Sequence, residues 1–348
     1  MLSEFSSNVV LSKARAMYGK RLTVQNYADL LACQSVGEVA VYLKENTAYE
    51  KVLSGIEETE IHRGQLEAKL KQKVLEEYAS LCHYEITVGE HFAQYFIKRN
   101  EIDQILHIIL LLDAGIPENY LFNMPSYLLR HTKIDLKAFS KIKTFDDLLR
   151  VLNHTEYRRI LEPFSPDENG WINYTGIESA LYSYLYSSIF RIIKKYTHGE
   201  TAKQLNDILQ SYIDLTNFTR IVRLKISYHS EPEFVKKALF PYGTFREHLL
   251  DKMMEATSEE EITAILGTTE IGKRALKFEH DYVGEIPRRM NFRNCYHYLD
   301  FSTHPSVVLI SYIVTSETEI SDIITIVEGI RYHLATDEIR KLLIIVNN

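Results

Sequence analysis

The sequence predicts an all-α protein made of three diverged copies of one helical unit, each about 110 residues long. Glycine and proline are scarce, with 14 and 8 in 348 residues. This is roughly half of their usual share and disfavours a turn-rich β fold. Two short sequence patterns, the first box and the second box, each recur three times with a shared spacing. A repeated pattern of this length is typical of a chain that duplicated one supersecondary unit.

The first box opens with Ser or Thr, has an acid within three residues, and ends in an element anchored by Tyr or Ile. Its three occurrences are 35–53, 144–161 and 258–275. Ser or Thr followed closely by an acid is close to a helix N-cap signature. Each first box therefore predicts a short helix, a turn and a second short helix, anchored by Tyr49, Tyr157 and Ile271.

The second box has an acid and an amide-like residue three positions apart, followed by apolar residues at the fourth, seventh and eighth positions. The three acid pairs are Glu101 with Gln104, Asp214 with Asn217, and Glu319 with Asp322. The spacing places each pair on one helical face and the apolar residues on a stripe that buries against a neighbour.

Paired acids of this kind suggest either acid–base chemistry or a structural role. A catalytic pair is not expected once per copy, so the structural role is favoured. In that role we expect the acid to lie near a helix start, where it complements the dipole, and the amide to bond to the next unit.

The spacings of the two boxes agree with each other. Thr47 and Thr155 are 108 residues apart, and Thr155 and Thr269 are 114 apart; the acids of the second box are 113 and 105 apart. Turn-forming residues lie at 115–117, 163–170 and 230–243. The repeat period and the turn-forming segments together predict three helical repeat domains, 1–117, 118–235 and 236–348.

Long helices are predicted between the boxes, at Gln65–Tyr78 and Ile177–Tyr196, from strong helix formers and an apolar-aromatic stripe. The apolar run Val307–Val314 is compatible with a strand, but helical boxes flank it and we predict a helix. The tyrosines at 182, 184 and 186 are expected to pack in helix–helix seams.

Charge and apolar runs exclude some classes of function. The formal net charge of −7 disfavours a nucleic-acid binder, which needs a basic face. The most apolar run, Ile105–Leu112, contains His107 and is far shorter than the about 20 residues of a membrane span. The N-terminus has no apolar stretch of signal-peptide length. Three widely spaced cysteines without a CxxC motif indicate a reducing compartment.

No phosphate-binding glycine loop, HExxH motif or GxSxG motif is present in the sequence. His280 and Asp281 form the dipeptide of an all-helical metal phosphohydrolase, but that chemistry needs further ligands at set positions. We therefore predict no catalytic, cofactor-binding or metal-binding residues and no cofactor.

Two cysteine–histidine neighbours, Cys82 with His83 and Cys295 with His297, invite a zinc interpretation. Four ligands with paired spacing are needed for a structural zinc site, so a core thiol beside a helix histidine is favoured. A basic group, Arg220, Arg223 and Lys225, follows the second box of the middle copy. It meets either an acidic partner or acids of the chain's own surface.

Four segments carry a resemblance to one protein family. They are Lys13–Met17 (KARAM), the Leu43–Leu53 end of the first box, Asp214–Lys225 with its D-x-x-N start and R-x-K end, and Tyr312–Gly329. They resemble the central-stalk component that is designated C in archaeal-type ATPases and d in eukaryotic vacuolar ATPases. Departures from the family pattern are Leu11, Gln104 and Asp322, each at a position where the family has Asn.

This resemblance implies three pseudo-symmetric helical domains in a funnel-like arrangement. It implies a non-catalytic central-stalk adaptor of a V-type or A-type rotary ATPase, which joins the rotor-shaft subunits of D and F type to the proteolipid ring that moves H⁺ or Na⁺. Such an adaptor is peripheral on the cytoplasmic face of the membrane, contacts the membrane only through partners, and is present once per complex and monomeric when isolated. The alternatives are a helical-repeat scaffold of another complex and the metal phosphohydrolase.

Overall fold

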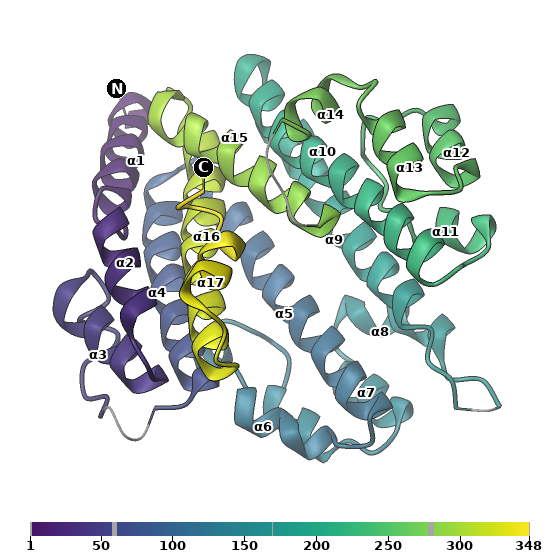
Figure 1. The fold of residues 1–348 in the computed structure, drawn as a ribbon, viewed down its shortest axis with the longest axis horizontal. Coiled ribbons are helices and arrows are strands. Elements are labelled where there is room, and N and C mark those ends of the chain that lie inside the picture. The colour runs from purple at the N-terminus through teal and green to yellow at the C-terminus, as the bar shows by residue number, and fades with distance from the viewer. Residues whose placement is uncertain (1, 58–60, 169, 278–281, 348) are drawn as a thin grey trace. The chain divides into compact units, whose positions relative to one another are not determined.

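The structure is a computed structural model that describes residues 2–57, 61–168, 170–277 and 282–347 (Figure 1). Within these ranges every regular element is a helix and no strand occurs. The all-α prediction is therefore confirmed, and the run Val307–Val314 lies inside one long helix. No helix of the described residues combines the length and the apolar composition needed to cross a membrane.

The chain divides into two compact units. Unit 1 comprises Met1–Gln94, Leu121–Thr132 and Phe292–Asn348, and unit 2 comprises Tyr95–Tyr120 and Lys133–Asn291. The helices of unit 1 are α1 (Leu2–Tyr18), α2 (Val24–Ala32), α3 (Val36–Asn46), α4 (Arg63–Tyr84), α16 (Pro305–Arg331) and α17 (Thr336–Leu342). The helices of unit 2 are α7 (Phe145–Val151), α8 (Glu156–Leu161), α9 (Tyr174–Tyr196), α10 (Gly199–Ile221), α11 (Pro232–Ala238), α12 (Glu247–Glu255), α13 (Glu259–Leu266) and α14 (Glu270–Ala275). Helices α5 (Gly89–Asp113), α6 (Tyr120–Asn123) and α15 (Ile286–Phe301) contribute residues to both units.

Helix α16 is the centre of unit 1. It contacts α1, α2, α3, α4 and α17, and Figure 1 shows it running alongside α1 and α4. Four consecutive residues, Val307–Ile310, are buried, so neighbours cover every face of the helix. Gly329 permits the close approach of α17, because a Cβ there would lie 2.4 Å from a side-chain carbon of Ile339.

Unit 2 is built on the long helices α9 and α10. The C-terminal half of α10 enters a core shared with α11, α12, α13, α14 and the start of α15. Its fully buried members include Leu215, Phe218, Ile221, Val235, Met253, Ile262 and Leu266. After Ile221 the backbone continues as a π-helical turn, Val222–Ser227.

The predicted caps of the first boxes are present. Ser35, Thr144 and Ser258 are the N-caps of α3, α7 and α13, and each side chain accepts a hydrogen bond from the backbone N–H three residues later. The predicted second short helix exists in the middle and last boxes as α8 and α14. The prediction is wrong for the first box, where 48–55 forms successive turns. There the Thr47 hydroxyl donates to the carbonyl of Leu43 and accepts from the N–H of Tyr49.

Candidate functional site

The second boxes begin at or beyond the middle of the three helices α5, α10 and α16 and extend through their C-terminal halves. The expectation that their acids lie near helix starts is therefore wrong. Glu101 and Glu319 are 8% exposed and Asp214 is 2% exposed. A charge inside a helix and away from water cannot be stabilised by the helix terminus, so each acid needs hydrogen-bond donors from elsewhere in the fold.

Glu319 accepts hydrogen bonds from two distant parts of unit 1. The Tyr49 hydroxyl lies 2.8 Å from Oε1, and the Leu22 backbone N–H lies 2.8 Å from Oε2. Burial raises the pKa of Glu319, and these two donors together with Lys73 partly offset the rise. The second box of the last copy thus binds the tyrosine of the first copy's first box.

Glu101 has the same kind of partner in unit 2. The hydroxyl of Tyr157 donates to its Oε2 at 2.7 Å. Burial, with the nearby Glu101 charge as a further cause, raises the pKa of Tyr157, so the phenol stays protonated and remains a donor. The second box of the first copy thus binds the tyrosine of the middle copy's first box.

Asp214 has no tyrosine partner of this kind. In the first box of the last copy, the position of the tyrosine is occupied by Ile271, which has no hydroxyl. The Thr244 hydroxyl donates to Oδ2, while the backbone N–H groups of Thr244 and Phe245 lie 2.8 and 3.1 Å from Oδ1. Burial raises the pKa of Asp214, and these donors partly offset the rise. A threonine hydroxyl from the following loop therefore replaces the tyrosine hydroxyl.

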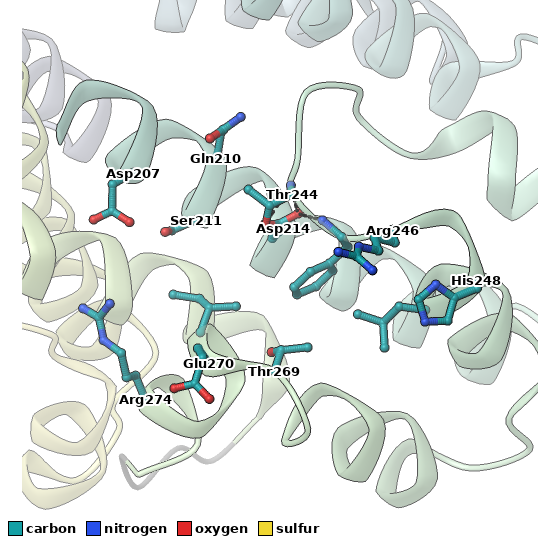
Figure 2. Close-up of a pocket in the computed structure, with 13 residues that line it drawn as sticks. Asp207, Gln210, Ser211, Asp214, Thr244, Arg246, His248, Thr269, Glu270 and Arg274 are labelled. Atoms are coloured by element: carbon teal, nitrogen blue, oxygen red, sulfur yellow. Dashed lines mark hydrogen bonds between the residues drawn. The ribbon is translucent and has the colours of Figure 1, made fainter. Parts of the chain in front are cut away.

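A pocket of about 660 Å³ lies beside Asp214, between α10 and the segment that contains Ile271. Figure 2 shows Thr244 directly against Asp214, with Thr269 and Glu270 across the pocket. Its charged lining side chains are Asp207, Asp214, Glu270, Arg246 and Arg274, and His248 also lines it. The pocket has no strong excess of one charge, and Asp214 is already hydrogen-bonded within the chain.

In each second box, the polar residue three positions after the acid forms hydrogen bonds with the segment that follows the helix. The Tyr120 hydroxyl donates to Gln104 at 2.9 Å. Asn217 bonds both the N–H and the carbonyl of Phe240 at 2.8 Å. Asp322 accepts from the N–H groups of Ile344 and Ile345, at 2.9 and 2.8 Å. In all three second boxes this residue therefore holds the following segment against the helix by hydrogen bonds, whether it is an amide or an acid.

The apolar stripe of each second box is buried as predicted. Its members are Ile105, Ile108 and Ile109, then Phe218, Ile221 and Val222, then Ile323, Ile326 and Val327, and none is more than 3% exposed. With the acids engaged by hydroxyl and backbone donors and the stripes packed, the arrangement supplies rigid links between distant segments.

The basic group after Asn217 meets mainly groups of its own chain. Arg220 forms an ion pair with Glu178, and Lys225 donates to the carbonyl of Met254. Arg223 is exposed and makes no hydrogen bond or ion pair with the described residues. Of the three, Arg220 alone pairs with an acid of the chain, and that pair is largely buried rather than on the surface.

Both candidate zinc cysteines, Cys82 and Cys295, are buried thiols that form no disulfide among the described residues. Burial raises the pKa of Cys82 to about 12, which disfavours the thiolate that a metal requires. The described part of the chain contains no group of three or more His, Cys, Asp or Glu side chains that could hold a metal ion. His280 and Asp281 lie outside the described residues.

Sequence reasoning missed the donors that reach the acids. The recurrence of Tyr49 and Tyr157 at the same position of the first box could have indicated these bonds, because the hydroxyl of a buried tyrosine usually has a hydrogen-bond partner. Leu22 and Thr244 carry no such signal, since one acts through its backbone N–H and the other lies in a loop without a recurring pattern.

The chain is similar to a known protein family and to a characterised relative. The family model described as ATP synthase (C/AC39) subunit matches residues 10–342. The C subunit of the A-type ATP synthase from Methanocaldococcus jannaschii is 26% identical over 268 residues, which cover 72% of this chain and 64% of the relative. The matched stretch thus spans less than two thirds of that relative's length. Because the family model covers nearly the whole chain, including all three second boxes, this chain belongs to the ATP synthase (C/AC39) subunit family.

Proposed function

We propose that this chain is a non-catalytic central-stalk adaptor of a V-type or A-type rotary ATPase. It joins the rotor shaft to the proteolipid ring, so that rotation of the shaft drives H⁺ or Na⁺ transport through the ring. The observation that carries this proposal is the family match over residues 10–342. The name of the archaeal relative, which is the C subunit of an A-type ATP synthase, supports the same assignment.

The contacts of the boxes support an origin in three copies, with bounds 1–117, 118–235 and 236–348. The middle copy's Tyr157 reaches the acid of the first copy, and the first copy's Tyr49 reaches the acid of the last copy. Ile271 of the last copy lines the pocket beside the acid of the middle copy. Each first box thus meets the second box of the copy that precedes it in a cyclic order.

This cyclic order of contacts between copies is suited to an adaptor that transmits torque. Close-packed interiors transmit strain with little deformation. Each buried tyrosine–carboxylate bond ties two segments that lie far apart in the sequence, which limits sliding of one against the other. We infer that these links keep the adaptor stiff while it passes torque from the shaft to the ring.

The partners in this proposal are shaft subunits of D and F type and the proteolipid ring. The chain lies on the cytoplasmic face of the membrane, contacts it only through these partners, and is present once per complex. The isolated chain is a monomer.

The test is reconstitution with the shaft subunits and the ring encoded in the same genome. We expect the chain to co-purify with both in one-to-one stoichiometry with the shaft. We also expect ATP-driven ion transport to require it in vesicles that hold the remaining subunits. Transport of equal rate without the chain, or its failure to bind either the shaft or the ring, would contradict the proposal.

A parallel metal analysis separates the adaptor from an enzyme. The purified chain is expected to hold no stoichiometric divalent metal. A bound metal that is lost in the double substitution His280→Ala and Asp281→Ala would instead support the phosphohydrolase, since these two side chains would be its ligands.

A further inference from the structure

The chain leaves the helix of each second box through the same kind of left-handed corner. Gly115 follows α5 with a φ of 72°, His229 follows the π-helical turn after α10 with a φ of 51°, and His333 follows α16 with a φ of 55°. Only glycine adopts this conformation without steric cost, so the two histidines indicate that the fold requires it there. The three residues therefore mark one equivalent position in the three copies.

Each corner is closed by a backbone hydrogen bond from the residue that follows it. The three bonds run from the N–H of Ile116 to the carbonyl of Leu111, from Leu334 to Gly329, and from Ser230 to Leu224, each 2.9 Å long. The bonds of the first and last copies span five residues, as in the Schellman cap of an ordinary α-helix. The bond of the middle copy spans six. The corner of the middle copy is thus the same cap with one extra residue.

The spacing of the second-box residues shows the same difference. The acid of the box precedes the corner by 14 residues in the first and last copies and by 15 in the middle copy. Beyond the corner the spacing agrees again. Phe240, which binds Asn217, and Ile344, which binds Asp322, each lie 11 residues past the corner of their copy. The extra residue of the middle copy therefore falls between Asn217 and His229.

The π-helical turn Val222–Ser227 lies in this interval. In an α-helix each N–H bonds to the carbonyl four residues earlier, whereas in a π-turn it bonds to the carbonyl five residues earlier. Here the N–H of Tyr228 donates to the carbonyl of Arg223 at 3.2 Å. A single π-turn therefore holds one residue more than the α-helix on either side of it. The helices of the other two copies, α5 and α16, are α-helical from end to end.

Contacts on both sides of the turn show why the extra residue must be confined to it. Ile221 before the turn and Leu224 within it are buried in the core of unit 2. Lys225 donates to the carbonyl of Met254 in the last turn of α12. An extra residue in a regular α-helix would rotate everything after it by about 100°. The π-turn avoids this rotation, because its surplus residue is taken up locally while Arg223 stays exposed to solvent.

We propose that the π-helical turn is a register device, which absorbs the one residue by which the second-box helix of the middle copy exceeds those of the other two. It allows the Asn217–Phe240 bonds and the corner at His229 to form in the same order as in the other copies. The inference rests on the three-copy origin and not on the adaptor role. Reconstitution tests that role, whereas the deletions below test the register.

The test is the removal of one residue from the turn. Deletion of Arg223 or of Ser227, which are both exposed, is expected to leave a regular α-helix with the contacts on both sides in place. The controls of equal length are Arg223→Ala and Ser227→Ala, which remove the side chain without changing the register. Each deletion variant is expected to melt within about 3 °C of its control, as followed by circular dichroism.

Deletion of Glu328 from α16 is the matched comparison, because this helix has no residue to spare. Glu328 directly follows the apolar stripe of its second box, as Arg223 does in the middle copy. Its deletion is expected to rotate the corner at His333 away from its position and to separate Ile344 from Asp322. The melting temperature is expected to fall more than about 8 °C below that of Glu328→Ala, which controls for the lost ion pairs of the side chain.

A crystal structure of the Ser227 deletion variant separates register from stability. We expect the corner bond from Ser230 to Leu224 to remain and to span five residues, with His229 still left-handed and Asn217 still bonded to Phe240. A π-turn that persists in this variant would overturn the proposal. So would deletions of Arg223 and Ser227 that both lower the melting temperature, or abolish folding, as severely as the deletion of Glu328 does.

Discussion

A buried carboxylate is costly unless donors satisfy its oxygens, and the three second-box acids meet this need in different ways. Glu319 and Glu101 each receive a tyrosine hydroxyl, and Asp214 receives that of Thr244. Losing one donor leaves the remaining acid under-bonded in the interior. The hydroxyls are therefore expected to contribute far more to stability than exposed phenols of the same chain.

Tyr49→Phe tests this expectation directly. The substitution keeps the ring and removes the hydroxyl that binds Glu319, so the free energy of unfolding is expected to fall by about 1–3 kcal/mol. Urea denaturation followed by circular dichroism measures it. Tyr332→Phe is the control in unit 1, because Tyr332 is 71% exposed, and a change within about 0.5 kcal/mol is expected. Equal effects of the two substitutions would show that the hydrogen bond to Glu319 contributes no more to stability than an exposed tyrosine hydroxyl does.

The pH dependence of stability gives a second test of Glu319. Burial raises its pKa above the usual 4.5, so between the unfolded and folded pKa values the native state binds more protons than the unfolded state. The stabilising contribution is then complete below the unfolded pKa and is lost as the pH rises through the folded pKa. Glu319→Gln cannot titrate, so the stability of the wild type relative to this variant is expected to decrease as the pH rises from 4.5.

Urea midpoints of both proteins across this pH range measure the effect, which amounts to about 1.4 kcal/mol for each unit of pKa difference. Exposed Glu45→Gln serves as the control and is expected to show a nearly constant difference from the wild type. A wild type that gains stability relative to Glu319→Gln with rising pH would contradict the raised pKa.

At the scale of elements, the short helices of the first boxes depend on their caps. Helices of six to eight residues, such as α7 and α13, are too short to be stable alone. In α7 the Thr144 hydroxyl accepts from the N–H of Asp147, and the Asp147 carboxylate accepts from the N–H of Thr144. This reciprocal capping box fixes the start of the helix.

Thr144→Ala is expected to lower the free energy of unfolding by about 1 kcal/mol, because it leaves the first-turn N–H of Asp147 without its partner. Thr144→Ser keeps the hydroxyl and is the matched control, with less than half of that loss expected. Chemical denaturation measures both. If serine and alanine destabilise the protein equally, the capping hydroxyl is not the cause.

The sequence could predict these elements because their signals are local. Cap residues, the spacing of apolar residues and the long helix-forming runs all act within a few positions of the chain. It failed at 48–55, where turns replace the expected second helix. It also failed to place the acids far from the helix starts, because the spacing of a pattern does not show where its helix begins.

At the scale of the whole molecule, the two tyrosine–carboxylate links lie in different compact units. Tyr49 and Glu319 belong to unit 1, and Tyr157 and Glu101 belong to unit 2. The two links share no partner. Sites without shared partners usually contribute independently to stability.

The double substitution Tyr49→Phe with Tyr157→Phe is therefore expected to cost the sum of the two single effects, within about 0.5 kcal/mol. A double-mutant cycle by urea denaturation measures the difference. A larger deviation would mean that the two links are coupled through the chain, as strain carried from one copy to the next would produce.

The sequence by itself determined the helical class, the capped short helices, the buried stripes and the recurrence of both boxes, since these follow from local chemistry and period. Tertiary structure alone decided which donor reaches each acid. The helical period shows which face a carboxylate occupies, but not which distant segment packs there. Thus Tyr49 binds Glu319 across 270 residues of sequence. Likewise, Thr244 takes the place of the hydroxyl that Ile271 lacks, because a buried acid requires a donor from whichever segment the packing brings to it.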